Sequence, residues 1–222
     1  MSASAVASPP KITWDDCVVL HNVSWETYDQ LVAEDGERRV PRISYDRGIL
    51  ELVTPSLPHE KDALTITRIV DVVAALLGTP VLSAGATAYR QRAMQRGFEP
   101  DASFYVQNEP LMRESRQIDL AIDPPPDIVL EMEMSRSALD KLPLFANLSV
   151  PEVWRCDGER VTILALEVNA YREVLASRAL PVLTADILTH FLALSRTELS
   201  PAWFRAVSEW AMAQQQNPDS SE

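Results

Sequence analysis

Apolar residues recur at helical spacing in several stretches of the chain. The clearest is 59–77, where Ala63, Ile66, Val70, Val73 and Leu77 form one stripe. Pro58 fits the first turn of that helix, and Gly78 follows its end. Shorter stretches with the same spacing predict helices at 24–35, from about 139 through 148, from 184, and from 200 onward.

Other stretches have the pattern of strands and turns. The apolar residues of 42–53 flank Asp46-Arg47-Gly48, and those of 153–166 flank Asp157-Gly158, so both are expected to be β-hairpins. Short strands are expected at 81–84, 86–90, 104–107 and 171–175. The resulting order of helices and strands predicts a single α/β domain with a mixed sheet flanked by helices. We expect this domain to span 11–212, between a disordered tail at 1–10 and a polar tail at 213–222.

One predicted strand, 127–134, has acidic residues in place of apolar ones on part of one face. Ile128, Leu130 and Met132 alternate with Val129 and Glu131, and Glu133 continues the second series. Strand side chains alternate between faces, so Glu131 and Glu133 should share a face. Acidic side chains in an otherwise apolar strand are costly unless they are solvated or bound to a cation.

Composition narrows the function classes. The 222 residues include 32 Asp and Glu against 20 Lys and Arg, a formal net charge of −12, which argues against coating nucleic acid through bulk charge. The 6 glycines are not clustered, so no phosphate-cradling loop is expected. Two distant cysteines, with no apolar run long enough for a membrane span, favour a reduced cytoplasmic protein.

Asp101, Glu131, Glu133 and Lys141 are the candidate catalytic groups. Asp101 precedes a predicted strand, and Lys141 falls in the first turn of the helix after Glu133. Carboxylates at adjacent strand ends can hold Mg²⁺, which usually takes one or two of them together with water. A nearby lysine can orient that water or offset charge on a phosphate. Each residue also has an ordinary alternative, as a turn former, a solvated strand face or a surface lysine.

At these residues the chain resembles the Uma-type endonucleases of the PD-(D/E)XK nuclease superfamily. The resemblance is carried by SWETYDQL, ISYDRGILELVTPSLPHE, GFEPDASFYVQNE and DPPPDIVLEMEMSRSALDKLPLFANLSVPEVWRCDG, and it covers most of 24–192. It implies a restriction-endonuclease-like fold and metal-dependent hydrolysis of DNA with Mg²⁺ or Mn²⁺. It also makes a homodimer an expectation.

The resemblance assigns roles to individual residues. Asp101 matches the aspartate of the PD element and Glu131 the acid of the next strand, so both would hold metal, with Glu133 as a further ligand. Glu133 stands where the superfamily has lysine, and Lys141 is at the place from which a helix lysine can replace it.

Four more residues complete the set of candidates. Glu60 matches a helix acid that often completes the site, and His59 beside it matches a histidine that the family often carries. His59 also lies on the core stripe of its helix, so a buried structural role stays open. Thr87 and Arg90 could contact phosphate or simply lie on the surface. Two further readings remain, a non-catalytic binding or assembly module with the same fold and a metal hydrolase acting on a small substrate.

Overall fold

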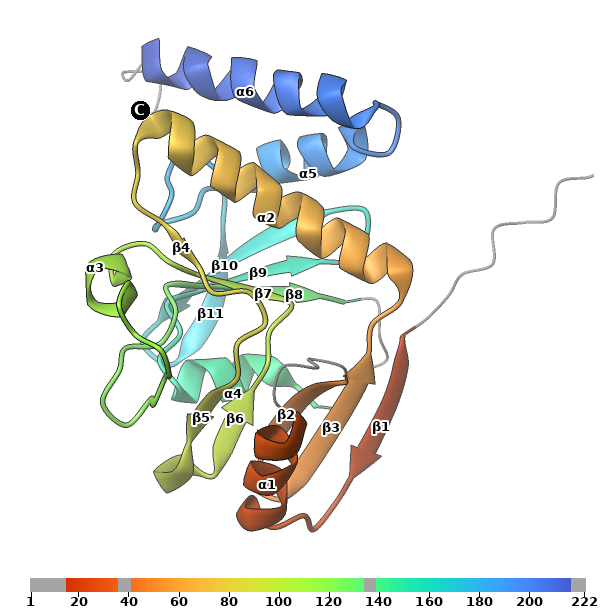
Figure 1. Cartoon of the computed structure of the whole chain (residues 1–222), viewed down its shortest axis with the longest axis vertical. Helices are drawn as coiled ribbons and strands as arrows, with labels where there is room; N and C mark the ends of the chain where they lie inside the picture. The colour runs from red at the N-terminus through yellow and green to blue at the C-terminus, as the bar shows by residue number, and fades with distance from the viewer. Residues whose placement is uncertain (1–14, 36–40, 134–138, 217–222) are drawn as a thin grey trace, which may run out of the picture.

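The computed structural model describes residues 15–35, 41–133 and 139–216, which form two β-sheets with helices packed against them (Figure 1). The mixed α/β class is therefore confirmed, with the strands divided between two sheets. The predicted tail at 1–10 lies outside the described residues. No helix in the described ranges is long and apolar enough to cross a membrane.

The first sheet has the strand order β1-β3-β2-β6-β5 and is antiparallel throughout. Its strands are β1 (Asp16–Leu20), β2 (Arg42–Asp46), β3 (Ile49–Thr54), β5 (Tyr89–Gln91) and β6 (Arg96–Phe98). Helix α1 (Trp25–Asp35) packs on it through a small aromatic cluster, with Tyr28 stacked on Tyr45. The sequence pattern did not predict β1 or β6, because β1 has only half-buried and exposed side chains and β6 has only three residues.

The predicted β2–β3 hairpin is present, and its turn explains why glycine is needed there. Arg47 and Gly48 both have positive φ, 46° and 96°, as a tight hairpin turn between twisted strands requires. Helix α1 also begins where expected, because Ser24 Oγ accepts a hydrogen bond from the Thr27 amide at 3.1 Å.

The second sheet has the order β11-β10-β9-β8-β7-β4, and only β8 and β9 run parallel. Its strands are β4 (Leu82–Ser83), β7 (Ala102–Tyr105), β8 (Ile128–Met132), β9 (Glu152–Cys156), β10 (Val161–Glu167) and β11 (Ala170–Val174). The parallel pair requires a crossover, and helix α4 (Lys141–Asn147) lies in that connection. Strand β8 is buried on both faces, as predicted for a central strand.

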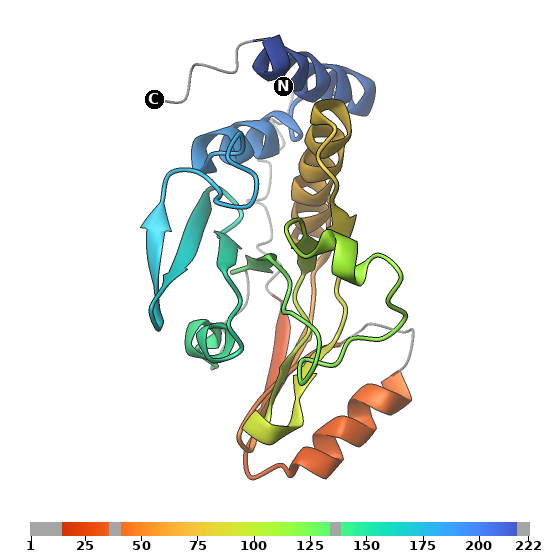
Figure 2. The ribbon, with the colours of Figure 1, turned by 90° about the vertical axis from the view of Figure 1, so that its left-hand side faces the viewer.

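Helices cover both faces of this second sheet (Figure 2). On one face, α2 (Leu57–Leu77) and α5 (Ala185–Leu194) cover the sheet, and α6 (Ser200–Gln216) packs on these two helices; all three belong to the hydrophobic core that contains Ile128, Leu130 and Trp154. On the other face, α4 packs its Leu144 and Phe145 against Val129. The short helices η1 (Arg92–Met94) and α3 (Glu109–Met112) lie in connections. Because α6 continues to Gln216, the first residues of the predicted polar tail are helical.

The starts of two helices lie close to the end of β8. Helix α2 begins after β3, and its first turn carries His59 and Glu60. Helix α4 begins at Lys141, with Asp140 as its N-cap accepting a hydrogen bond from the Leu142 amide. Side chains from both sheets and both helix starts therefore meet at one place.

Candidate active site

Asp101 and Glu131 face each other across the β7–β8 pair. The pairing of Ala102 with Leu130 places Asp101, one residue before β7, opposite Glu131. The Asp101 amide donates to the Leu130 carbonyl at 3.1 Å, which continues the ladder to this point. Antiparallel pairing therefore brings together two acids that are thirty residues apart in sequence.

Lys141 joins this pair from α4. Its Nζ lies 2.7 Å from Oε2 of Glu131, and only 18% of its side chain is exposed. Burial acts to lower the pKa of Lys141, but the negative charges of Glu131 and Asp101 outweigh it and raise the pKa above its ordinary value. The lysine is therefore charged at neutral pH.

Glu131 keeps one oxygen atom without a partner. Its Oε1 is buried and accepts no hydrogen bond from the described residues. Burial, followed by the charge of Asp101, raises the pKa of Glu131 to about 7, although Lys141 opposes the shift. A buried carboxylate oxygen with no donor is costly, so this atom is suited to a cation that the protein itself does not supply.

Each oxygen of Asp101 has a partner. The Met132 amide donates to Oδ2 at 2.7 Å, and His59 Nε2 lies 2.7 Å from Oδ1. Arg42 Nε is 3.5 Å from the same Oδ1. Burial acts to raise the pKa of Asp101, but the His59 hydrogen bond and charge outweigh it and lower the pKa. Asp101 is therefore ionised at neutral pH.

His59 and Glu60 reach the site from the first turn of α2. His59 is 2% exposed, as its place on the core stripe predicted, and it lies between Asp101 and Asp15. Burial lowers the pKa of His59, but the two carboxylates more than offset this and raise it to about 9. Glu60 is partly exposed and pairs with Arg42 Nη2 at 2.9 Å, so Arg42 links Glu60 to Asp101.

Three other candidates have partners elsewhere. Glu133, just beyond β8, forms an ion pair with Arg155 of β9 and is 39% exposed. Arg90 pairs with Asp29 of α1 at 2.7 Å, and Thr87 Oγ1 donates to the Ala84 carbonyl. The structure therefore brings Asp101, Glu131, Lys141, His59 and Glu60 together, and gives Glu133, Thr87 and Arg90 other contacts.

Asp15 and Arg42 belong to the cluster but were not among the candidates from sequence. Asp15 Oδ2 contacts a histidine that lies 44 positions further along the chain. Arg42 reaches Asp101 from a different sheet. Neither residue lies in a local motif, so no pattern in the sequence could have singled it out.

The chemistry of this donor set fits a small divalent cation held mainly by water. Within the described residues, no group of three or more His, Cys, Asp or Glu side chains is arranged to hold a metal ion. Mg²⁺ needs fewer, since it usually takes one or two carboxylates and completes its shell with water and substrate oxygens. Asp101 and Glu131, with its unpartnered Oε1, meet that requirement.

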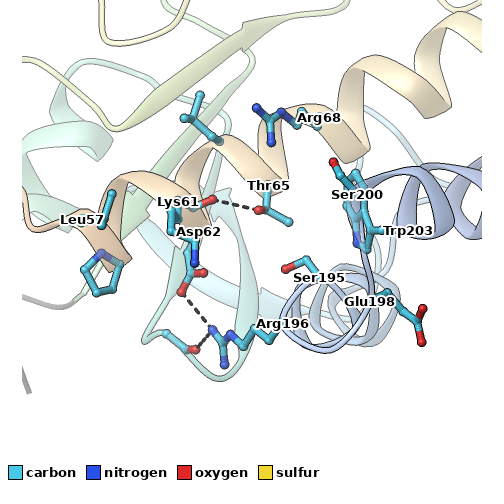
Figure 3. Close-up of a pocket in the computed structure, with 13 residues that line it drawn as sticks. Leu57, Lys61, Asp62, Thr65, Arg68, Ser195, Arg196, Glu198, Ser200 and Trp203 are labelled. Carbon is cyan, nitrogen blue, oxygen red and sulfur yellow. Dashed lines mark hydrogen bonds and ion pairs between the residues drawn. The ribbon is translucent and has the colours of Figure 1, made fainter. Parts of the chain in front are cut away.

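A separate cavity of about 540 Å³ lies between α2 and the segment that joins α5 to α6 (Figure 3). Lys61, Asp62 and Arg68 of α2 line one side of it, and Arg196 and Trp203 line the other. Arg196 bridges the cavity through Asp62, at 2.9 Å, and the Gly158 carbonyl. None of Asp101, Glu131 and Lys141 lines this cavity, so it is separate from the acidic cluster.

Known proteins resemble the chain in sequence and in fold. The model of the Uma2 family, described as "Putative restriction endonuclease", matches residues 25–195. A crystal structure of a putative nuclease belonging to DUF820 from Anabaena variabilis superposes with a TM-score of 0.51. It is 15% identical and covers 74% of this chain and 98% of its own, so it supports the fold alone. No curated protein matches the sequence. Since the family model spans most of the chain, this protein belongs to the Uma2 family of restriction-endonuclease-like proteins.

Proposed function

We propose that this protein is a divalent-metal-dependent nuclease that hydrolyses phosphodiester bonds in DNA at Asp101, Glu131 and Lys141. The observation that carries the proposal is the unpartnered Oε1 of Glu131, buried beside an ionised aspartate and a charged lysine. Family membership supports the same reaction class. A purely structural cluster would be expected to satisfy each of its buried carboxylate oxygens.

Each residue has a distinct role in this proposal. Asp101 and Glu131 bind Mg²⁺ or Mn²⁺ through oxygens not used by Met132 and Lys141. A bound ion would supply positive charge beside the scissile phosphate and lower the pKa of a water molecule. Lys141 holds Glu131 with one of its three N–H donors. Its remaining donors can orient the attacking water or hydrogen-bond a phosphate oxygen as negative charge develops.

Of the remaining acidic candidates, Glu60 has a supporting role and Glu133 has none. Glu60 is held by Arg42 at the rim of the cluster, where its partly exposed carboxylate could accept hydrogen bonds from water around the metal. Glu133 has no ligand role in this proposal, because Arg155 already neutralises it at the protein surface.

A second reading, a non-catalytic module with the same fold, also has support. Both oxygens of Asp101 already have protein partners, a hydrogen bond from the Met132 amide at Oδ2 and an ion pair with His59 at Oδ1, and glutamate occupies position 133 where the superfamily has lysine. The net charge of −12 also disfavours tight binding of DNA without metal. In this reading the cluster is a remnant that contributes only to packing. Hydrolysis of a small substrate is the third reading.

A cleavage assay on matched variants separates these readings. Supercoiled plasmid is incubated with the purified protein in Mg²⁺, in Mn²⁺ and in EDTA. We expect metal-dependent nicking or linearisation that Glu131→Gln and Asp101→Asn each reduce by more than about 100-fold, since even outer-shell partners of metal sites are worth about 10 to 100-fold. Glu133→Gln is the matched control, the same exchange two positions along the strand.

The possible outcomes discriminate clearly. Cleavage by Glu133→Gln within about threefold of the wild-type rate supports Glu131 as the ligand. Equal losses in Glu131→Gln and Glu133→Gln would overturn the proposed ligand set. Cleavage that survives both Asp101→Asn and Glu131→Gln would indicate a contaminating nuclease. An inactive wild-type protein on plasmid, single-stranded DNA and RNA favours the non-catalytic module.

A further inference from the structure

His59 is enclosed between two aspartates and has no ring nitrogen left for a substrate. Nδ1 lies 2.7 Å from Oδ2 of Asp15, and Nε2 lies 2.7 Å from Oδ1 of Asp101. The side chains of His59 and Asp15 are 3% and 0% exposed. A residue so placed acts on the site through Asp101 rather than by contact with DNA.

Asp15 connects the site to the start of α2. Its Oδ1 accepts a hydrogen bond from the Ser56 amide at 2.8 Å, while its Oδ2 contacts His59. Ser56 is the N-cap of α2, yet its own side chain makes no capping hydrogen bond. One carboxylate therefore fixes both the first residue of the helix and the histidine in its first turn.

Strand pairing explains how Asp15 reaches this position. Asp16 pairs with Thr54 at the end of the β1–β3 ladder, so Asp15 lies beside the segment that leads into α2. The family model begins only at residue 25, after β1 has ended. The support for His59 therefore comes from a part of the chain that the family match does not include.

The contacts of Asp101 show what this support would achieve. The Met132 amide donates a hydrogen bond to Oδ2, and the His59 ring is ion-paired with Oδ1 at 2.7 Å, so the carboxylate is held from both sides. Metal ligands depend on such outer contacts for their orientation, and loss of one typically costs about 10 to 100-fold in metal affinity or activity. The orientation of Asp101 therefore depends on that of His59.

We propose that Asp15 is a positioning residue which, through His59, orients Asp101 for the divalent cation. This inference rests on the proposed function, because it concerns the metal site of that reaction. The chain of contacts runs from Asp15, one residue before β1, through His59 of α2 to Asp101, one residue before β7. It makes the segment that enters the first strand, rather than the nuclease core alone, a determinant of metal affinity.

The test compares three changes at Asp15 in the full chain. Asp15→Ala removes both hydrogen bonds, and Asp15→Ser is too short to reach His59 but leaves a hydroxyl near the Ser56 amide. Asp15→Asn removes one of the two carboxylates that raise the pKa of His59, so Nδ1 of a neutral His59 can accept from the new amide while the new carbonyl accepts from the Ser56 amide. Mn²⁺ affinity is measured by titration calorimetry, and cleavage is measured across a range of Mn²⁺ concentrations.

Asp127→Ala is the matched control for stability. Asp127 is also a buried aspartate that accepts hydrogen bonds from backbone amides, those of Val106 and Asn108, at the opposite end of the β7–β8 pair. Thermal unfolding of each variant identifies a temperature at which all of them are folded, and Mn²⁺ binding is measured at that temperature. A loss of general stability would affect Asp127→Ala as much as Asp15→Ala. A change in the orientation of Asp101 would affect Asp15→Ala alone.

We expect Asp15→Ala and Asp15→Ser to weaken Mn²⁺ binding by about 10 to 100-fold, with Asp15→Asn and Asp127→Ala within about threefold of wild type. At saturating Mn²⁺ much of the cleavage rate should return. Unchanged Mn²⁺ affinity in folded Asp15→Ala or Asp15→Ser would overturn the inference while leaving the proposed function intact. Equal loss in Asp15→Asn would overturn positioning by hydrogen bonds. Absence of Mn²⁺ binding and cleavage in the wild type would defeat the proposed function itself.

Discussion

The cluster around Asp101 and the cavity along α2 both contain opposite charges, but their burial differs. The Glu131–Lys141 pair is 10% and 18% exposed, whereas Arg196 of the Arg196–Asp62 pair is 42% exposed. Removing charges from water is expensive, and their attraction repays that cost only partly. A buried cluster with an unpartnered oxygen therefore indicates chemistry better than a larger, more open cavity does.

The first way to test this comparison is to break the buried pair. Lys141→Met leaves Glu131 without its partner and should destabilise the protein by about 3–5 kcal/mol, whereas the double variant Lys141→Met with Glu131→Gln should recover most of that loss. Denaturant unfolding without metal measures both. A single variant as stable as wild type would mean that the pair is solvated, and the contrast with the α2 cavity would disappear.

Metal binding should stabilise the cluster and leave the cavity unaffected. Mg²⁺ at about 100 times its dissociation constant should add about 2.7 kcal/mol to the free energy of unfolding, because a ligand that binds only the folded state stabilises it by mass action. Thermal unfolding with and without EDTA measures this. Glu131→Gln should abolish the gain, and Arg196→Ala should keep it. A gain that persists in Glu131→Gln would place the ion elsewhere.

The Arg196–Asp62 pair should contribute much less than the buried pair. Because Arg196 is partly exposed, Arg196→Ala is expected to cost about 1 kcal/mol or less, with the cleavage rate unchanged. Burial raises the pKa of Asp62 and Arg196 opposes that shift, so a double-mutant cycle with Asp62→Asn isolates the pair. A coupling energy as large as that of Glu131 and Lys141 would show that the two regions do not differ.

The smallest effect is expected at Lys61, which also lines the cavity. It forms no ion pair in the described part of the chain, so Lys61→Gln should change stability by no more than about 0.5 kcal/mol and cleavage by less than about twofold. Unfolding and plasmid assays check this at low salt. If Lys61→Gln instead cleaves poorly at low protein concentration and normally at saturating protein concentration, the cavity takes part in binding DNA.

Local patterns predicted most of the elements because their physical causes are local. Helical periodicity located α2, the Asp46-Arg47-Gly48 turn located the first hairpin, and alternation identified β8 as a central strand. The pattern failed for β1 and β6, whose exposed or very short stretches are defined by pairing with strands from elsewhere in the chain. The division into two sheets is likewise a matter of long-range pairing.

The candidate site shows the same limit more sharply. The alternation of side chains along a strand puts Glu131 and Glu133 on the same face, so it cannot show which of them is a metal ligand. The family resemblance implied that both are ligands. In the folded chain α4 covers Glu131 and supplies Lys141, whereas Glu133 lies past the end of the strand beside Arg155. Burial by a neighbouring helix is what separates two residues of the same type.

The sequence by itself determined the class of fold, the family resemblance and the identities of Asp101, Glu131 and Lys141 as candidates. Only the tertiary structure decided which oxygens stay unpartnered, that Arg42 joins Glu60 to Asp101, and that Asp15 supports His59 from just before the first strand. The physical reason is distance along the chain. Propensity and periodicity act over a few residues, whereas hydrogen bonds between residues tens of positions apart exist only after the sheets and helices have packed.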